Sequence, residues 1–309
     1  MTARLLAVVD LGSNSFHAQL AHVTPGAPPV ISVIDRARAT VQLAAGLRRD
    51  GTLSDAAQRR GLRVLRHFGD VLRSWQPHAV RVVATNTLRV ASNRAAFVQR
   101  GTTLIGHPIE VIPGIEEAHL IYRGVAYAVP PRPERRRLVL DIGGGSTECA
   151  VGDGHAVHLA ESRPVGCVTL TRQRFPRGLI TPGHLRTAID VASQAMADVA
   201  PRVRALGFDE AIGSSGTIQS AGAMLAAAGV TDGTVTSRGL SELEGALCRA
   251  GRVAGLALPG LRPDRANVLA GGLAVLRAAF DTLGIEELRV SPGALREGVL
   301  LELHARAAR

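Results

Sequence analysis

Two short segments of this chain share one pattern at a constant spacing. AVVDLGSNSFH begins at Ala7 and LVLDIGGGSTE begins at Leu138. Each reads as an apolar run, then D-[LI]-G-x-x-S, then a second β-type run, and the Asp, Gly and Ser recur 131 residues later (141 − 10, 143 − 12, 146 − 15). A strand, a turn of small residues and a second strand indicate a β-hairpin. One such turn is common in proteins, but two in the same register predict two domains that open with the same strands.

The rest of the chain alternates between strand-like and helix-like stretches. A third strand can follow each hairpin, in PVISVIDRA after the first and in HAVHLAESRPV after the second. Short β-rich runs, AVRVVAT and IEVIPG, follow in the first half. The alternation predicts an α/β fold. Duplicated hairpins that hold a phosphate are typical of actin, Hsp70 and sugar kinases, so we expect two actin-like (ASKHA, ribonuclease H-like) domains that flank an interdomain cleft.

Helix boundaries can be predicted from capping residues. Ser54 is a candidate N-cap for a helix with Leu65, Phe68 and Leu72 on one stripe. Pro182 opens, and Gly207 can close, a second helix, and Gly284 can end a helix that begins near Arg265. Ser241 and Glu244 have the spacing of a capping box. The proline-rich stretch at 129–137 interrupts the pattern, so we expect an N-terminal domain over 1–125 and a C-terminal domain over 126–309.

Composition excludes several classes of protein. The chain has 309 residues, including 34 glycines, and 46% of its residues are hydrophobic. This length and hydrophobic content suffice for two hydrophobic cores. Charges interrupt every apolar run, and Asp10 interrupts the N-terminal one, so neither a membrane span nor a signal peptide is expected. The cysteines (Cys149, Cys167 and Cys248) show no metal-binding or disulfide pattern, which favours a reducing, cytoplasmic location. All 36 cationic residues are arginine and the net charge is +10, but only 3% of residues are aromatic, so nucleic acid is not an expected partner.

Four stretches have the chemistry of a phosphate site. Glycine lets backbone amides approach phosphate oxygens closely, small hydroxyl side chains add donors, and the amides at a helix N-terminus attract anions. An arginine just past a strand end can bind phosphate with two N–H groups, although a surface ion pair would also explain it. The candidate phosphate-binding residues are Ser13, Asn14, Ser15, Arg89, Gly143, Gly144, Gly145, Ser146, Thr147, Ser215, Gly216 and Thr217.

Acidic residues accompany these loops. Asp10 and Asp141 occupy equivalent strand ends, and Glu148 lies just beyond the second loop. Carboxylates repel a phosphate unless a cation lies between them, so the pattern predicts Mg²⁺. Pro113 and Gly114 then end a strand before a helix whose first turn holds Glu116 and Glu117. Adjacent helix residues point about 100° apart, so one of the two can serve as a base for water, and the residues alone do not decide which.

The chain resembles short, two-domain members of the Ppx/GppA phosphatases, which are exopolyphosphatases and guanosine pentaphosphate phosphohydrolases. The resemblance runs almost end to end. It rests on DLGSNSFH (10–17), TNTLR (85–89), IPGIEEAHLI (112–121), DIGGGSTE (141–148), ESRPVGCV (161–168), GSSGT (213–217) and SPGALREGVL (291–300).

The resemblance implies Mg²⁺-dependent removal of a terminal phosphate by water. It selects Glu117 as the catalytic base, assigns magnesium to Asp141 and Glu148, and assigns phosphate to Arg89, Ser146 and the glycine loops. It also implies a homodimer. One departure is His119, where the family commonly has arginine, so a cation that contacts phosphate is lost or the position does not touch substrate.

Inorganic polyphosphate is the expected substrate, and the exopolyphosphatase reaction is the expected activity. The nearest alternative is hydrolysis of pppGpp to ppGpp at the same site. A kinase of the same superfamily would need an adenosine pocket after GSSGT, and the two glutamates favour water as acceptor. A non-catalytic nucleotide sensor or actin-like assembly protein would bind ATP without releasing phosphate.

Overall fold

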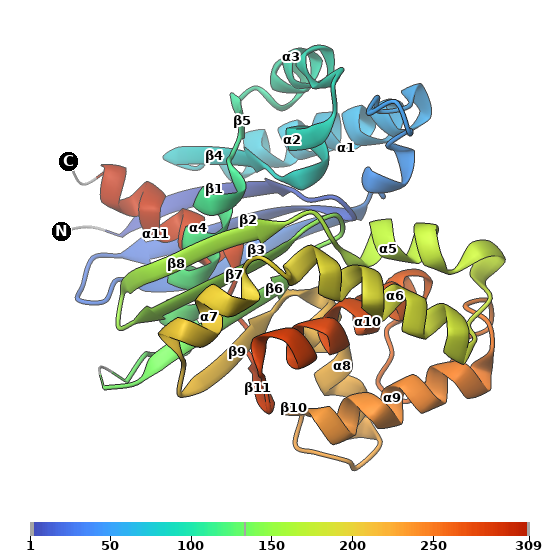
Figure 1. The fold of residues 1–309 in the computed structure, drawn as a ribbon. Helices are drawn as coiled ribbons and strands as arrows, with labels where there is room; N and C mark the ends of the chain where they lie inside the picture. Colours follow the sequence, from blue (N-terminus) through green and yellow to red (C-terminus); the bar gives the residue numbers. More distant parts are fainter. Residues whose placement is uncertain (1–2, 133, 308–309) are drawn as a thin grey trace. The chain divides into compact units, whose positions relative to one another are not determined.

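The computed structural model describes residues 3–132 and 134–307 (Figure 1). They divide into two compact units. Unit 1 comprises the chain up to Tyr127 together with the segment from Gly293 onward, and unit 2 comprises Ala128–Pro292. Each unit has its own mixed β-sheet with helices packed against it, so each is an α/β body with its own core.

Unit 1 contains a five-stranded sheet in the order β3-β2-β1-β4-β5. β1, β2 and β3 form an antiparallel meander, and β4 and β5 extend the sheet in parallel with β1. The strands are β1 (Arg4–Leu11), β2 (Ser15–Thr24), β3 (Val30–Thr40), β4 (Ala79–Ala84) and β5 (Ile109–Val111). The helices are η1 (Ala44–Gly46), α1 (Asp55–Trp75), α2 (Asn86–Val90), α3 (Arg94–Ile105), α4 (Gly114–Ala128) and α11 (Leu295–Ala307).

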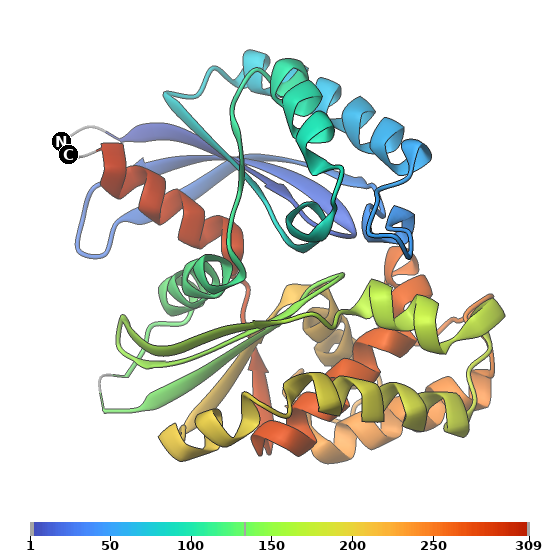
Figure 2. The same cartoon turned by 45° about the horizontal axis from the view of Figure 1, so that its top comes forward.

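Helices cover the unit 1 sheet on both faces. α1 and α3 pack on the face that carries Val9 and Val82, and α11 lies on β1 and β4 on the other side (Figure 2). The predicted cap of α1 is confirmed, because the Ser54 side chain accepts a hydrogen bond from the Ala57 amide. The predicted apolar stripe of α1 is also confirmed, because Leu65, Phe68 and Leu72 are buried. An amphipathic helix buries such a stripe against the core.

Unit 2 contains a six-stranded sheet in the order β10-β11-β9-β6-β7-β8. The strands are β6 (Arg136–Ile142), β7 (Thr147–Asp153), β8 (Ala156–Arg163), β9 (Glu210–Ser214), β10 (Val235–Thr236) and β11 (Glu287–Val290). The helices are α5 (Cys167–Arg174), η2 (Pro176–Gly178), α6 (Pro182–Met196), α7 (Ala200–Leu206), α8 (Ser215–Ala227), α9 (Ser237–Ala250), η3 (Pro263–Arg265) and α10 (Ala266–Leu283).

The two sheets repeat one plan. In unit 2, β8-β7-β6-β9-β11 has the same strand order as β3-β2-β1-β4-β5 in unit 1. Asp10 pairs with His17 and Val83, and Asp141 pairs with Glu148 and Ser214, so these three equivalent positions are each 131 residues apart (141 − 10, 148 − 17, 214 − 83). The predicted duplication is therefore confirmed, as is the actin-like α/β fold class.

The core of unit 2 centres on α10, in which nearly every residue is buried. The helix ends at Gly284 in the left-handed region (φ 76°), as predicted, because glycine adopts this conformation without a steric cost. The stretch Pro263–Leu283 is long and apolar enough to cross a membrane, yet 78% of its most apolar window is buried inside the structure. That burial is expected of a helix in a protein core.

Three boundaries differ from the sequence predictions. The capping box at Ser241 and Glu244 is wrong, because Thr236 caps α9 five residues earlier by accepting a hydrogen bond from the Gly239 amide. The helix predicted from Pro182 to Gly207 is two helices, α6 and α7. The predicted C-terminal domain, 126–309, differs from the observed division in its last segment, because α11 packs on β1 and β4 and so joins unit 1.

Candidate active site

The β6–β7 turn of unit 2 is held by the first turn of α5. The carbonyl of Gly143 accepts a hydrogen bond from the Cys167 amide (3.0 Å), and the carbonyl of Gly144 accepts one from the Val168 amide (2.9 Å). In a trans peptide unit the C=O and N–H point in opposite directions. The amides of Gly144 and Gly145 therefore point away from α5, as a backbone site for phosphate oxygens requires.

Side chains complete this turn. Ser146 and Thr147 are both buried. The Thr147 hydroxyl donates to the Val165 carbonyl (2.7 Å), so its proton is committed to the fold. Gly166 lies directly behind the loop, because a Cβ there would be 2.5 Å from the Gly145 nitrogen. The turn is thus built from close backbone contacts that larger residues would prevent.

Two carboxylates lie side by side next to the turn. Asp141 and Glu148 are direct cross-strand partners in the β6–β7 pair, so their side chains share one face of the sheet. Hydroxyl groups orient both: Ser214 Oγ donates to Asp141 Oδ2 (2.5 Å), and Ser162 Oγ donates to Glu148 Oε1 (2.7 Å). Glu148 is buried and Asp141 is half-buried. This pair therefore presents carboxylate oxygens in fixed positions.

The β9–α8 junction forms a second loop in unit 2. Ser215 has φ +93°, a left-handed value that costs a non-glycine residue energy and is most often found at functional sites. Its hydroxyl accepts from the Ile218 amide (3.4 Å), and Thr217 is buried in the first turn of α8. The guanidinium of Arg265 covers Gly216 so closely that a Cβ there would lie 2.0 Å from its Nη2. A cation and a helix N-terminus therefore meet at this loop.

The β1–β2 turn of unit 1 resembles the β6–β7 turn, because its carbonyls also accept hydrogen bonds from a neighbouring segment of the same unit. The Ser13 carbonyl accepts from the Ala44 amide (2.9 Å), and the Asn14 carbonyl accepts from the Gln42 amide (2.8 Å). By the same peptide geometry, the amides of Asn14 and Ser15 point the other way. Ser13, Asn14 and Ser15 are all buried. The Thr87 hydroxyl, at the start of α2, donates to Ser13 Oγ (2.8 Å) and so connects this turn to the β4–α2 segment.

Arg89 and Glu117 meet in unit 1. Arg89 Nη1 lies 2.9 Å from Glu117 Oε2 and 3.0 Å from the carbonyl oxygen of Ile112. Glu117 is buried in the first turn of α4, as predicted, whereas Glu116 is partly exposed and pairs with Arg81. His119, the departure from the family pattern, is exposed on α4. The two adjacent glutamates therefore have different partners, and only Glu117 contacts a candidate phosphate ligand.

The carboxylates fit a magnesium ion in one unit only. Mg²⁺ binds through one or two carboxylates and otherwise keeps water and substrate oxygens, and Asp141 with Glu148 supplies such a pair. In unit 1 the cross-strand partner of Asp10 is His17, so the pair is not repeated there. Within residues 3–132 and 134–307, no group of three or more His, Cys, Asp and Glu side chains is gathered for a metal.

Sequence reasoning missed several residues that shape the site. Ser162 and Gly166 lie inside the motif ESRPVGCV, so the motif itself was the available signal. Ser214 lies within GSSGT, next to the residues that were assigned. Arg265 had no local signal, because it lies 49 residues after Gly216 (265 − 216) in an ordinary helix-leading stretch.

Comparison with known proteins gives consistent results. The model of the Ppx/GppA phosphatase family matches residues 20–307. The chain is 39% identical over 300 residues to a Haemophilus influenzae protein whose provisional name is exopolyphosphatase, covering 97% of this chain and 91% of that protein. It is 40% identical over 299 residues to the guanosine-5'-triphosphate,3'-diphosphate pyrophosphatase of Aeromonas hydrophila, covering 97% of this chain but 59% of that protein.

Solved structures share the fold. An exopolyphosphatase from Cytophaga hutchinsonii superposes with a TM-score of 0.86 at 22% identity, covering 98% of each chain. The Ppx-GppA enzyme of Aquifex aeolicus superposes with a TM-score of 0.77 at 24% identity, covering 97% of this chain and all of that one. The family match and the two close relatives confirm the resemblance read from the motifs: this chain belongs to the Ppx/GppA phosphatase family.

Proposed function

We propose that this protein is an exopolyphosphatase, which releases orthophosphate from the end of inorganic polyphosphate by Mg²⁺-assisted attack of water. Its family is one of phosphatases that act on phosphoanhydrides. The observation that carries the proposal is the Gly143–Thr147 turn, whose carbonyls bind α5 while the amides of Gly144 and Gly145 point away. The backbone amides of such a turn bind phosphate oxygens and need no contact with a base or ribose. A turn of this kind therefore suits a substrate that consists of phosphates alone.

Each residue then has a role in positioning and charge neutralisation, the main tasks in phosphoryl transfer. In unit 2, the Gly144 and Gly145 amides and Ser146 bind phosphate oxygens, and the Ser215–Thr217 loop, with Arg265, binds further ones. In unit 1, Arg89 binds a phosphoryl oxygen, and the turn at Ser13, Asn14 and Ser15 offers amides and hydroxyls. Glu117 orients water and accepts its proton.

Asp141 and Glu148 would hold magnesium in this proposal, with Ser214 and Ser162 orienting their oxygens. A bound Mg²⁺ would supply positive charge against the phosphate oxygens. Asp10, the third carboxylate that the sequence assigns to the metal, has His17 rather than an acid as its cross-strand partner, so the proposal places the metal on the unit 2 pair. The proposal also includes a reducing, cytoplasmic setting and a homodimer. The three cysteines are free thiols, which suits such a setting.

The second candidate activity is hydrolysis of pppGpp. The observation in its favour is the 40% identity to the Aeromonas hydrophila pyrophosphatase, as high as that to the exopolyphosphatase relative. Both reactions break a terminal phosphoanhydride, so the same residues would serve either substrate.

Phosphate release decides between the candidates. Purified protein with Mg²⁺ is assayed on polyphosphates of several lengths, on pppGpp and on ATP, with Glu117→Gln as the inactive control. Release from polyphosphate that Glu117→Gln abolishes supports the exopolyphosphatase. Release from pppGpp alone would replace it with the second candidate. ATP binding without release from any substrate would contradict both and favour a nucleotide sensor.

A further inference from the structure

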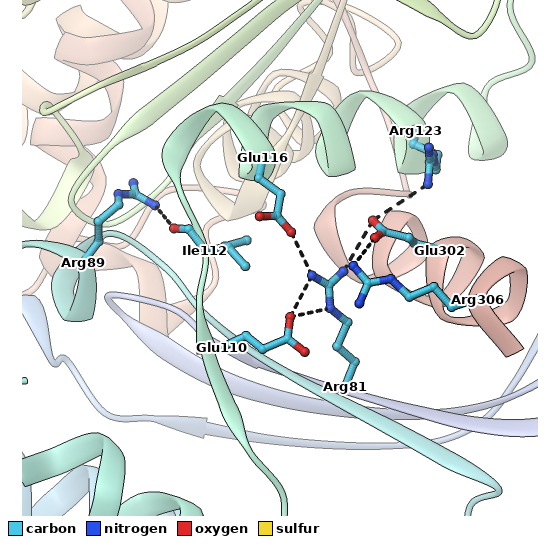
Figure 3. A network of polar contacts seen from close by, with 8 residues as sticks. All are labelled: Arg81, Arg89, Glu110, Ile112, Glu116, Arg123, Glu302 and Arg306. Atoms are coloured by element: carbon cyan, nitrogen blue, oxygen red, sulfur yellow. Dashed lines mark hydrogen bonds and ion pairs between the residues drawn. The ribbon is translucent and has the colours of Figure 1, made fainter. Parts of the chain in front are cut away.

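Arg81 is a buried cation in the middle of unit 1, held by three glutamates from three different elements. Its side chain is 2% exposed. Nε lies 3.0 Å from Glu110 on β5, Nη2 lies 2.8 Å from Glu116 on α4, and Nη1 lies 3.4 Å from Glu302 on α11. Figure 3 shows the guanidinium at the centre of this Arg81 network. One side chain of β4 therefore joins a strand and two helices.

The charges in the network balance. Glu302 also contacts Arg306 (2.5 Å) and Arg123 (3.9 Å), so three glutamates face three arginines (Figure 3). Burial alone would lower the pKa of Arg81, but its hydrogen bonds to Glu110 and Glu116 outweigh that effect and raise the pKa above the usual value. A buried guanidinium is stable only when paired in this way. The network thus keeps the buried guanidinium paired and charged.

The Arg81 network includes Glu116, the residue next to Glu117. Arg81 binds Glu116 and Arg89 binds Glu117, and both arginines come from the β4–α2 segment. Because consecutive helix residues point about 100° apart, the two contacts hold the first turn of α4 from different directions. They constrain its rotation as well as its position.

The other part of α4 is fixed by direct backbone packing against α11. A Cβ on Gly124 would lie 1.8 Å from the Ala294 carbonyl oxygen, and a Cβ on Gly298 would lie 1.9 Å from the Leu120 carbonyl oxygen. Such glycines allow two helices to approach within backbone contact. These two close contacts lie at Leu120 and Gly124, beyond the first turn, where Glu116 and Glu117 make the ion pairs described above.

We propose that Arg81 is a positioning residue for hydrolysis: acting through Glu116, it fixes the first turn of α4 and so places the Glu117 carboxylate. The inference rests on the proposed role of Glu117 as the base. Arg81 does not touch the substrate in this scheme. A loss of placement of about 1 Å can cost about 100-fold in rate, so the contact of Glu116 with Arg81 should be visible in kcat.

The three glutamates provide a matched test. Glu116→Ala, Glu110→Ala and Glu302→Ala each remove one carboxylate from the same guanidinium, and the partial exposure of these glutamates favours folded variants. We expect Glu116→Ala to lower kcat for phosphate release about 10- to 100-fold with KM little changed. Glu110→Ala and Glu302→Ala should lose comparable stability in urea while keeping most of kcat. Glu116→Gln, which retains a hydrogen-bond acceptor, should recover part of the loss.

Amide hydrogen exchange separates this inference from the proposed function. Peptides from the first turn of α4 should exchange faster in Arg81→Met and Glu116→Ala, whereas peptides from the Gly124 region should not. If the wild-type protein releases no phosphate, the proposed function fails, and the exchange pattern still reports whether Arg81 anchors α4. Equal losses of kcat in the Glu116 and Glu110 variants would overturn the inference. Unchanged exchange in Arg81→Met would overturn it as well.

Discussion

Arg89 and Glu117 form an ion pair in which Nη1 of the arginine lies 2.9 Å from Oε2 of the glutamate. The glutamate side chain is 8% exposed, so a buried carboxylate is held by the arginine that we assign to phosphate. The same nitrogen donates to the Ile112 carbonyl, which fixes the guanidinium. A phosphate that binds Arg89 would thus arrive beside the proposed base.

This arrangement predicts the effect of replacing Glu117. Glu117→Gln should lower kcat by about 10²- to 10⁴-fold, because the amide can still accept from Arg89 but cannot take a proton from water. Binding of polyphosphate, measured by fluorescence or calorimetry, should persist. Glu117→Asp keeps the carboxylate on a shorter side chain and should retain intermediate activity. Full activity of Glu117→Gln would remove the base assignment.

Gly166 should not tolerate a larger side chain. Gly166→Ala places a Cβ 2.5 Å from the Gly145 nitrogen and 2.6 Å from the Gly144 carbonyl carbon, so the turn must move. We expect a loss of about 1–3 kcal/mol in the free energy of unfolding and a raised KM, measured by urea denaturation and phosphate release. The control is Gly183→Ala at the start of α6, where the added Cβ meets nothing nearer than 3.8 Å. Equal behaviour of the two variants would contradict the role of Gly166.

The Mg²⁺ concentration that phosphate release requires should depend on the serine hydroxyls that donate hydrogen bonds to Asp141 and Glu148. Removing divalent metal with EDTA should abolish phosphate release, and added Mg²⁺ should restore it. Ser162→Ala removes the donor to Glu148 Oε1 and should raise the Mg²⁺ concentration for half-maximal activity about 10-fold. Ser74→Ala, which removes an exposed hydrogen bond on α1, should leave it unchanged. An unaltered Mg²⁺ titration of Ser162→Ala would argue against Glu148 as a ligand.

The cysteines should differ in reactivity. Burial raises the pKa of the Cys149 thiol to about 12, and burial also raises the pKa of Cys167. Neither forms much thiolate near pH 8, and both are inaccessible. Burial raises the pKa of Cys248 too, but this thiol is partly exposed, so iodoacetamide should label it first in the native protein. Mass spectrometry checks this, and Cys248→Ser should abolish native labelling. Native labelling of Cys167 at the same rate would contradict the expectation.

Short-range sequence patterns predicted the parts of the protein that short-range physics determines. The hairpin turns at Gly12 and Gly143, the cap at Ser54 and the helix end at Gly284 each depend on the conformations open to a few adjacent residues. The α9 boundary was mispredicted because two caps competed, and Thr236, the last residue of β10, is the one used.

Local sequence patterns account for the duplicated α/β plan, the glycine and serine turns and the positions of the acids, because strand, turn and helix preferences repeat at a fixed spacing. Which distant groups meet follows instead from the way the chain packs in three dimensions. Arg265 covers Gly216, Arg81 joins Glu116 to Glu302, and α11 returns to the first sheet. Such contacts depend on strand order and helix packing, which bring together residues that no local pattern connects.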